Sequence, residues 1–410
     1  MPGKPTRYDL PRSAVIEGRE PIRVVVYTVS QPGGAQISLA TLVRFLDANV
    51  DVTVMGTSEE GVADVAAARP GTPTCVVPAV RNKLDVRSIC AHVRALRHLR
   101  PDLLHVSCDN QWSAPYALLA GVLTRTPTIG VVHGPAPAWR RRQRLLVQWL
   151  ARAVDAYVSV SKSSAAATAS SLGLSPGSVR TIYNGVRRPP TSSNATGRSP
   201  TSGTRPTGPG PVVASVGRFA PEKGFDVLVR AMAELPRARL VLFGDGEERA
   251  NLESLAERLG LSERVHFAGW VSSPWDTSFQ IDIFAMPSRR EGFGITAVEA
   301  MMSRIPVVAS DAGGIPEIVE HERTGLLVPV DDPKALAEAI GRLLDDPQLR
   351  ERLVDAAETV TSVRYTPEAM AASYEALYSE VLRERLSTGR RPFSRRHLRT
   401  ARETSTSPTP

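Results

Sequence analysis

Short runs of consecutive apolar residues alternate with helix-length amphipathic segments along most of this 410-residue chain, and this alternation limits its fold more than any other feature. In the first half, such runs predict strands at Ile22–Val29, Val52–Met55, Cys75–Val77, Leu103–Val106, Thr128–Val132 and Tyr157–Val160. Helical patterns at Val86–Leu99 and Trp139–Val154 lie between some of them. Continuously apolar strands are covered by helices on both faces, which predicts a mostly parallel sheet.

The same alternation restarts after residue 211. Strands are predicted at Val212–Val216, Leu240–Phe243, Val265–Phe267, Ile281–Ala285 and Pro306–Ala309. Helices are predicted at Phe225–Glu234, Glu247–Leu259, Thr296–Met302, Pro333–Leu344 and Ala369–Leu386. We therefore expect an α/β protein of two Rossmann-like domains that face each other across a cleft, with a ligand at the carboxyl ends of the strands.

The segments between and outside these patterns predict the domain bounds. Thr191–Gly210 is rich in Thr, Ser, Gly and Pro and has no large apolar residue, so it reads as part of a linker. The predicted order is a disordered leader (1–20), an N-terminal domain (21–187), the linker (188–211), a C-terminal domain (212–365), a helix returning to the N-terminal domain (366–387) and a basic disordered tail (388–410).

The net charge of +8 is concentrated at the C-terminal end. Eight arginines and two glutamates between residues 381 and 410 carry +6 of it, so the rest of the chain is nearly neutral. A nucleic-acid binder needs a basic face within its fold, and we expect no nucleic-acid partner. Three cysteines with no close pair argue against a disulfide scaffold and a thiolate zinc site, and no metal is expected.

No apolar run reaches the length of a membrane span, and the first residues lack the apolar stretch of a secretory signal. We therefore expect a cytoplasmic protein. One segment leaves a membrane role open: residues 139–144 read W-R-R-R-Q-R and precede Leu145, Leu146 and Trp149 in a helical pattern. A basic amphipathic helix can hold a protein to anionic lipid at the inner membrane face, although the pattern also fits a core helix with a cationic start.

The first candidate site is Gly217–Gly224, with the sequence G-R-F-A-P-E-K-G, between a predicted strand and a predicted helix. Arg218 and Lys223 would present two cations near the start of that helix. Helix-start amides and fixed cations together favour a diphosphate. Because no Gly-Lys-Ser/Thr follows, a P-loop ATPase is not expected.

The second candidate site is Pro287–Ala300, which places Glu291 on a Gly-rich loop after a strand and Glu299 inside the following helix. Such a pair can bind a sugar hydroxyl at Glu291 and a ribose at Glu299. The amides of Gly292–Gly294 would lie between them and face phosphate. The apolar residues around Glu299 would bury it at a cost unless it had a partner.

Both stretches resemble motifs of glycosyltransferase family 4, the retaining sugar-nucleotide transferases with the GT-B fold of two Rossmann-like domains. Gly217–Gly224 resembles the family's G-R-x4-K-G, and Glu291–Glu299 resembles its E-x7-E. Shorter matches occur in the family's order over about residues 22–385 at Gly33-Gly34-Ala35, Val131–Gly134, Val158–Ser161, Asn184–Val186, Gly244–Gly246, Phe267–Val271, Asp311–Glu317 and Gly325–Val328.

The resemblance implies a role for each matching residue of the C-terminal domain, which would bind the nucleotide sugar. Arg218 and Lys223 would neutralise the departing diphosphate, Glu291 would hold donor-sugar hydroxyls, and Glu299 would hold the ribose. The remaining donor contacts implied in this domain are Phe293, Gly294 and Ile295 near the sugar and α-phosphate, and Val271 and Gly246 near the base.

In the N-terminal domain, the resemblance implies that Gly34 lets loop amides reach phosphate and that His133 shapes the pocket at the reacting sugar. The acceptor would be held by this domain, with Asp109, Asn110 and Gln111 as candidates after a strand. No cofactor is expected beyond the nucleotide sugar as co-substrate.

The expected function is therefore a metal-independent, retaining hexosyltransferase that moves a hexose or N-acetylhexosamine from a UDP-linked donor to an acceptor hydroxyl. Two acceptor classes remain open: a small metabolite such as an aminocyclitol antibiotic precursor, or a lipid-linked sugar or envelope polysaccharide. A non-hydrolysing sugar-nucleotide epimerase and a non-catalytic sugar-nucleotide sensor are the alternatives.

Overall fold

The computed structural model describes residues 21–29, 33–80, 85–110, 113–134, 141–189, 209–271, 274–276 and 281–388. The predicted leader, most of the predicted linker, the basic tail from residue 389, Gln111 and Trp139 lie outside these residues. The chain divides into two compact units, each described by itself. The N-terminal unit is formed by the described residues of Met1–Ser159, Ser164–Ile182 and Ala371–Pro410, and the C-terminal unit by those of Val160–Ser163 and Tyr183–Met370.

The N-terminal unit is built on a seven-stranded parallel sheet in the order β3-β2-β1-β4-β5-β6-β7. Its strands are β1 (Ile22–Thr28), β2 (Val50–Gly56), β3 (Thr74–Val76), β4 (Leu103–Cys108), β5 (Thr128–Val132), β6 (Ala156–Ser159) and β7 (Val179–Thr181). Its helices before the linker are α1 (Gly34–Phe45), α2 (Glu59–Ala67), α3 (Val86–Leu99), α4 (Pro115–Thr124), α5 (Arg141–Ala151) and α6 (Lys162–Leu172), of which α6 begins on residues assigned to the C-terminal unit.

The C-terminal unit is built on a six-stranded parallel sheet in the order β10-β9-β8-β11-β12-β13. Its strands are β8 (Val212–Val216), β9 (Arg239–Phe243), β10 (Val265–Gly269), β11 (Ile283–Met286), β12 (Val307–Ser310) and β13 (Leu326–Val328). Its helices are α7 (Phe225–Ala231), α8 (Arg249–Arg258), α9 (Ile295–Met302), α10 (Pro333–Asp345) and α11 (Pro347–Arg364), with 3₁₀ turns η2 (Pro221–Lys223), η3 (Met232–Glu234), η4 (Pro274–Asp276) and η5 (Ile315–Glu317).

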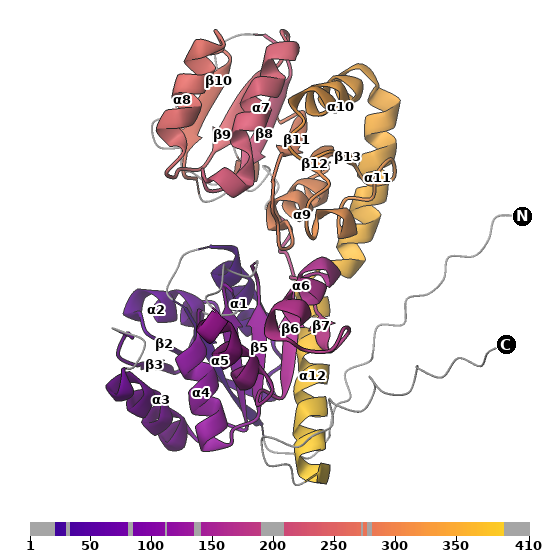
Figure 1. Cartoon of the computed structure of the whole chain (residues 1–410). Helices are drawn as coiled ribbons and strands as arrows, with labels where there is room; N and C mark the ends of the chain where they lie inside the picture. Colours follow the sequence, from indigo (N-terminus) through magenta and orange to yellow (C-terminus); the bar gives the residue numbers. More distant parts are fainter. Residues whose placement is uncertain are drawn as a thin grey trace, which may run out of the picture. The chain divides into compact units, whose positions relative to one another are not determined.

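Successive strand residues of the C-terminal unit pack into cores on opposite faces of its sheet. Ile283 and Ala285 of β11 belong to the core beneath α7, α8 and α10, whereas Phe284 and Met286 belong to the core beneath α9. Burial on both faces explains why the strand sequences are continuously apolar. Helices flank each of the two sheets in Figure 1, and the predicted α/β class with two Rossmann-like sheets is confirmed.

Helix α12 (Pro367–Thr388) joins the N-terminal unit from residue Ala371 onward. The hydroxyl of its Tyr378 lies 2.7 Å from Nδ1 of the buried His105. Arg385 donates two hydrogen bonds, of 2.7 and 2.8 Å, to the carboxylate of Asp155. Helix α12 is thus part of the N-terminal unit.

Most sequence-predicted bounds differ from those of the structure by one or two residues, and three of the differences have a structural reason or affect the domain bounds. The helix predicted at Phe225–Glu234 ends at Ala231 and continues as the 3₁₀ turn η3, and β11 begins at Ile283 rather than at Ile281. The compact units change at Tyr183 rather than after residue 187. The ring of Tyr183 packs edge-on against Tyr365 at 5.5 Å, which assigns this segment to the C-terminal unit.

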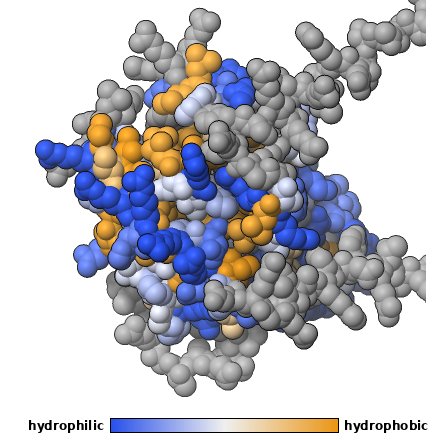
Figure 2. Space-filling view, turned by 90° about the horizontal axis from the view of Figure 1, so that it is seen from below, coloured by the Kyte–Doolittle hydropathy of each residue, from blue (hydrophilic) through white to orange (hydrophobic). Residues whose placement is uncertain are grey.

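Hydrophilic and apolar side chains interleave over the face of the molecule that Figure 2 shows, where the apolar ones gather in several patches. Among the helices that the structure describes, none is both long and apolar enough to cross a membrane.

Candidate active site

Arg218 and Lys223 lie on the loop that follows β8, and Glu291 lies on the loop that follows β11; these are the central pair of strands in the C-terminal unit. Gly246 and Val271 follow β9 and β10. The chain runs outward from β8 through β9 to β10, and from β11 through β12 to β13 in the opposite direction. Loops after the two central strands therefore diverge at the carboxyl edge of the sheet. This divergence is where open α/β sheets bind their ligands.

The loop after β8 is anchored by Phe219, which is fully buried and packs edge-on against Phe225 at a centroid distance of 5.0 Å. The amide of Phe219 donates to the carbonyl oxygen of Asp245 at 2.8 Å, so this loop runs alongside the loop after β9. A methyl group at Gly246 would lie 2.5 Å from the carbonyl oxygen of Phe219. Gly246 is thus required for the packing of the two loops, a reason independent of any ligand.

The side chains of the two predicted cations on this loop form ion pairs with acidic residues. Arg218 donates from Nη2 to Oε1 of Glu222 at 2.6 Å, and its side chain is 67% exposed. Lys223 donates from Nζ to Oε2 of Glu291 at 2.6 Å, with 28% and 14% of the two side chains exposed. The structure therefore brings together Lys223 and Glu291, which are 68 residues apart.

A 3₁₀ turn that ends at Lys223 lies between Arg218 and α7. The turn η2 precedes α7, and the amides of Lys223 and Gly224 donate to the carbonyl oxygens of Ala220 and Pro221 at 2.9 and 3.3 Å. These two amides are therefore engaged by the turn. At this loop the side chains of Arg218 and Lys223, rather than those amides, are the groups able to meet an anion.

The backbone around Glu291 is held by the loop after β12. The amide of Gly314 donates to the carbonyl oxygen of Glu291 at 3.0 Å. Gly313 has a left-handed conformation (φ 56°), and a methyl group on it would lie 2.1 Å from the same oxygen. Only glycine combines this φ with so close an approach, so Gly313 fixes the position of Glu291.

Arg289 connects the first turn of α7 with two loops of the site, a role that the sequence analysis did not assign. Its guanidinium makes two hydrogen bonds of 2.8 Å to the carboxylate of Asp226 and one of 2.5 Å to Asp331. It also donates to the carbonyl oxygen of Pro221 at 2.7 Å. The bond to Asp226 raises the pKa of Arg289 further above its usual range, so it remains a cation. The sequence feature that could have indicated this role is the position of Arg289, two residues before Glu291.

The helix that carries Glu299 begins directly after this loop. Gly294 is its N-cap with φ 105°, and no side chain caps the first turn of α9. Amides at a helix start favour an anion. Phe293 is buried and packs edge-on against Tyr365 at 5.6 Å, so its side chain belongs to the core. Ile295 also packs against that core.

Glu299 lies in the second turn of α9 and has one hydrogen-bond partner that the sequence analysis missed. Trp275 of η4 donates from its indole nitrogen to Oε2 of Glu299 at 3.0 Å. Burial raises the pKa of Glu299 to about 7, against the opposing effects of this bond and of the Arg187 charge. A half-buried carboxyl near its pKa at neutral pH is typical of a functional position. Val271 packs against the apolar residues under β8 and β9, beside the exposed Trp270.

The predicted residues of the N-terminal unit lie near the carboxyl ends of its strands. The amide of His133 donates to the carbonyl oxygen of Cys108, and its Nε2 lies 3.2 Å from the hydroxyl of Ser107. Nδ1 of His133 is buried with no hydrogen-bond partner among the described residues, and burial lowers the pKa of this ring to about 4, so it is neutral at pH 7.

The remaining candidates of this unit lie on other loops. Asp109 follows Cys108 directly, and burial raises the pKa of its carboxyl. Asn110 is held in a turn, since its carbonyl oxygen accepts from Ser113 Oγ at 3.0 Å. Gly34 begins α1, whose N-cap is Gly33 and whose first turn has no side-chain cap. Gln111 lies outside the described residues.

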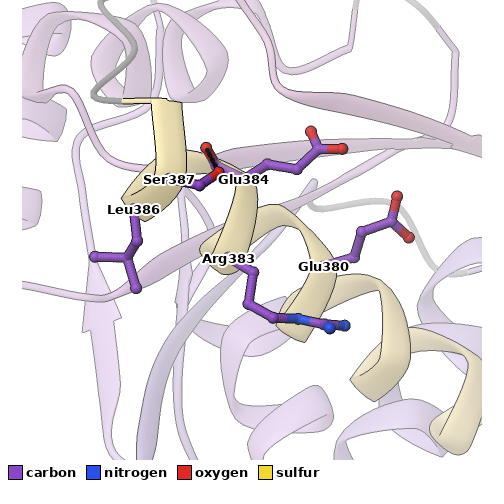
Figure 3. Close-up of a pocket in the computed structure, with 5 residues that line it drawn as sticks. All are labelled: Glu380, Arg383, Glu384, Leu386 and Ser387. Atoms are coloured by element: carbon purple, nitrogen blue, oxygen red, sulfur yellow. Dashed lines mark hydrogen bonds between the residues drawn. The ribbon is translucent and has the colours of Figure 1, made fainter.

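None of these residues borders the cavity in Figure 3, which has a volume of about 630 Å³ and lies along the end of α12. The described residues that line it are Glu380, Arg383, Glu384, Leu386 and Ser387. Within the described ranges, no group of three or more His, Cys, Asp or Glu side chains is arranged to hold a metal ion.

Both halves of the chain match family profiles. Residues 32–188 match the profile described as Glycosyltransferase Family 4, and residues 204–360 match the one described as Glycosyl transferases group 1. Solved structures of the same fold include Anabaena HepE in complex with UDP and glucose, with a TM-score of 0.73, 22% identity, and coverage of 87% of this chain and 99% of that one. A glycosyltransferase from Rickettsia africae has a TM-score of 0.74 at 17% identity, covering 89% and 99%.

Among curated relatives, the alpha-D-kanosaminyltransferase of Streptomyces kanamyceticus is 37% identical over 177 residues, 42% of this chain and 46% of that protein. The chain spans about half the length of that relative and of the two Rhizobium meliloti lipopolysaccharide core glycosyltransferases LpsE and LpsD. A longer match covers 78% of this chain and 88% of the lipopolysaccharide core mannosyltransferase LpcC of Rhizobium leguminosarum, at 30% identity over 333 residues. With both halves matched and this relative covered along most of its length, the chain belongs to glycosyltransferase family 4.

Proposed function

We propose that this chain transfers a hexose or N-acetylhexosamine from a UDP-linked donor to an acceptor hydroxyl, with retention of the anomeric configuration. The observation that carries the proposal is the Lys223–Glu291 pair at the point where the strand order of the C-terminal unit diverges, with Arg218 on the same loop. A cation and a carboxylate held side by side suit a ligand that presents a diphosphate next to sugar hydroxyls.

The proposed division of labour follows the charges that develop as the donor breaks. Cleavage of the anomeric C–O bond leaves negative charge on the diphosphate and positive charge on the sugar. Lys223 and Arg218 would stabilise the diphosphate, and fixed donors of this kind are typically worth about 10²–10³ in rate. These cations would take the place of a metal ion, and the acceptor's proton would pass to the departing phosphate oxygen as the new C–O bond forms.

Glu291 and Glu299 would hold the two sugars of the donor. Glu291 would accept hydrogen bonds from hydroxyls of the transferred sugar, and Glu299 from the ribose. Trp275 would keep one oxygen of Glu299 in place. UDP as the nucleotide is supported by its presence in a protein of the same fold, Anabaena HepE.

Two acceptor classes have support. The relative named as a kanosaminyltransferase favours a small aminocyclitol acceptor, and the relatives named for lipopolysaccharide core synthesis favour an envelope glycolipid. In either case we propose that Asp109, Asn110 and Gln111 of the N-terminal unit contribute to acceptor binding, and that His133 shapes the pocket at the reacting sugar.

The test is a donor screen read by product mass. The full chain is incubated with UDP- and GDP-linked hexoses and N-acetylhexosamines, each with a panel of aminocyclitols and glycolipids. We expect one donor to give a product heavier by one sugar residue, with the donor's anomeric configuration. An inverted product would contradict retention, and a new epimer formed from UDP-sugar alone would identify an epimerase instead.

A further inference from the structure

Helix α5 of the N-terminal unit presents an unusual concentration of large apolar side chains to solvent. Leu145, Leu146 and Trp149 are 61%, 55% and 48% exposed, and they fall within five consecutive positions of one helix. Single exposed apolar residues need no explanation, but a group of them on one helix marks an interaction surface.

The three exposed apolar residues are not among the buried residues that anchor this helix. Val147, Leu150 and Ala151 are buried in the core against the sheet, at helical positions opposite to Leu145 and Trp149. The helix is thus already anchored by one apolar face and exposes a second one. A helix that only packed against the core, with exposed arginines at its start, would need only the buried apolar face.

The charged side chains of α5 and of the residues that flank it are all positive. Residues 139–154 contain five arginines and no acidic residue. Arg144 and Arg152 of this group are exposed beside the apolar residues, and the three other arginines precede Gln143 in the sequence. Asp155, which follows the segment, is already paired with Arg385 of α12. No ion pair with Arg144 or Arg152 is formed among the described residues, so the described part of this surface combines apolar side chains with positive charge.

We infer that α5 docks onto an anionic phospholipid surface, with Leu145, Leu146 and Trp149 inserted at the level of the headgroups and with Arg144 and Arg152 bound to lipid phosphates. Helices of this composition lie in the plane of the membrane interface, where tryptophan and leucine meet the acyl boundary and arginine meets the anionic headgroups. This docking does not depend on the proposed transferase function. If that function also holds, docking would favour the lipid-linked acceptor class.

The experiment is cosedimentation of the full chain with vesicles of phosphatidylcholine alone or with phosphatidylglycerol. We expect binding to the anionic vesicles that weakens as salt is added. The double variant Leu145→Ser/Trp149→Ser should lower the partition coefficient about 10- to 100-fold. Arg144→Gln/Arg152→Gln should remove most of the preference for phosphatidylglycerol. The control is Val363→Ser, because Val363 is 51% exposed on α11 of the other unit, and this change should leave binding unaltered.

Several outcomes would overturn the inference. They are absence of binding by the unmodified chain, unchanged binding by the double variant, or loss of binding on removal of residues 389–410 alone. A concentration-dependent dimer that the double variant abolishes, without vesicle binding, would assign this face to a second copy of the chain. Thermal unfolding of the same variants should match that of the unmodified chain, which verifies that they fold by a measurement that does not depend on the proposed function.

Discussion

The ion pair between Lys223 and Glu291 joins two residues of the candidate site. Its atoms lie 2.6 Å apart at a partly exposed position, where such a pair contributes little to stability. The pair is better understood as holding both side chains in position. A bound diphosphate would draw the ammonium group from Glu291 and leave that carboxylate available for sugar hydroxyls.

Glu299 should make donor binding depend on pH. Its pKa is raised to about 7 by burial, so it is mostly protonated at pH 6 and mostly ionised at pH 8. A carboxylate accepts hydrogen bonds from ribose hydroxyls more strongly than a neutral carboxyl group. The advantage of the unmodified chain over Glu299→Gln in UDP affinity should therefore grow about tenfold between pH 6 and pH 8.

Calorimetric titration of UDP into both proteins at several pH values checks this expectation, because the titration of UDP itself cancels in the ratio. The pH dependence of the free energy of unfolding has the opposite sign. A carboxyl whose pKa is raised by folding contributes stability at low pH, and that contribution is lost as the pH rises through about 7. An affinity ratio that stayed constant would argue against a ribose contact at Glu299.

At the scale of elements, the site is a set of loops held against one another by backbone contacts. Gly313→Ala should displace Glu291, because the added methyl group would lie 2.1 Å from its carbonyl oxygen at a left-handed φ. We expect a loss of stability of about 1–2 kcal/mol or more and a drop in UDP affinity of at least about tenfold.

Gly260 offers a matched control for this change. It has a similar φ of 68°, but no atom lies within 4 Å of an added methyl group. Gly260→Ala should therefore show the cost of the left-handed conformation alone, about 1 kcal/mol, with UDP affinity unchanged. Thermal unfolding and calorimetry on both variants make the comparison. Equal effects on affinity would mean that the loop around Gly313 does not position Glu291.

Most strands and the long amphipathic helices could be predicted from the sequence, whereas some short or weakly patterned elements could not. The predicted strands at Thr128–Val132 and Val212–Val216 agree with β5 and β8 at both ends, as does the helix at Val86–Leu99 with α3. β7 has three residues and was not predicted. Helix α6 is mostly Ala, Ser and Thr, so it lacks the apolar stripe that indicates a helix.

The candidate site, too, could be predicted from the sequence only in part. Motif spacing pointed to Lys223, Glu291 and Glu299 as candidates, but the side chains that contact Lys223 and Glu299 in the structure come from distant parts of the chain. Asp226 and Arg289 are separated by 63 residues, and their ion pair depends on how two loops pack. No periodicity of the sequence encodes such a contact. The pairing of Trp275 with Glu299 was missed for the same reason.

At the scale of the whole molecule, helix α12 packs against the fold of the first half of the chain. A chain that ends at residue 370 would lack Tyr378, which contacts the buried His105, and Arg385, which pairs with Asp155. Buried Tyr374, Leu377 and Val381 would be lost as well. We expect the N-terminal unit of this truncated chain to unfold or to be digested rapidly.

A chain that ends at residue 388 is the matched control, because it keeps all of α12. Limited proteolysis followed by mass spectrometry should show an intact N-terminal unit in this chain and fragments of it in the shorter one. Equal resistance of the two chains would show that the N-terminal unit folds without α12.

The central claim is that the loop after β8 grips the diphosphate of a nucleotide sugar through Lys223. The most direct measurement is calorimetric UDP binding by Lys223→Ala, with Lys334→Ala as the control, because Lys334 is 82% exposed on α10. We predict that Lys223→Ala weakens UDP binding at least about tenfold and, with the true substrates, lowers turnover about 10²-fold or more, while Lys334→Ala behaves as the unmodified chain. Unchanged UDP affinity and turnover in a folded Lys223→Ala protein would contradict the account.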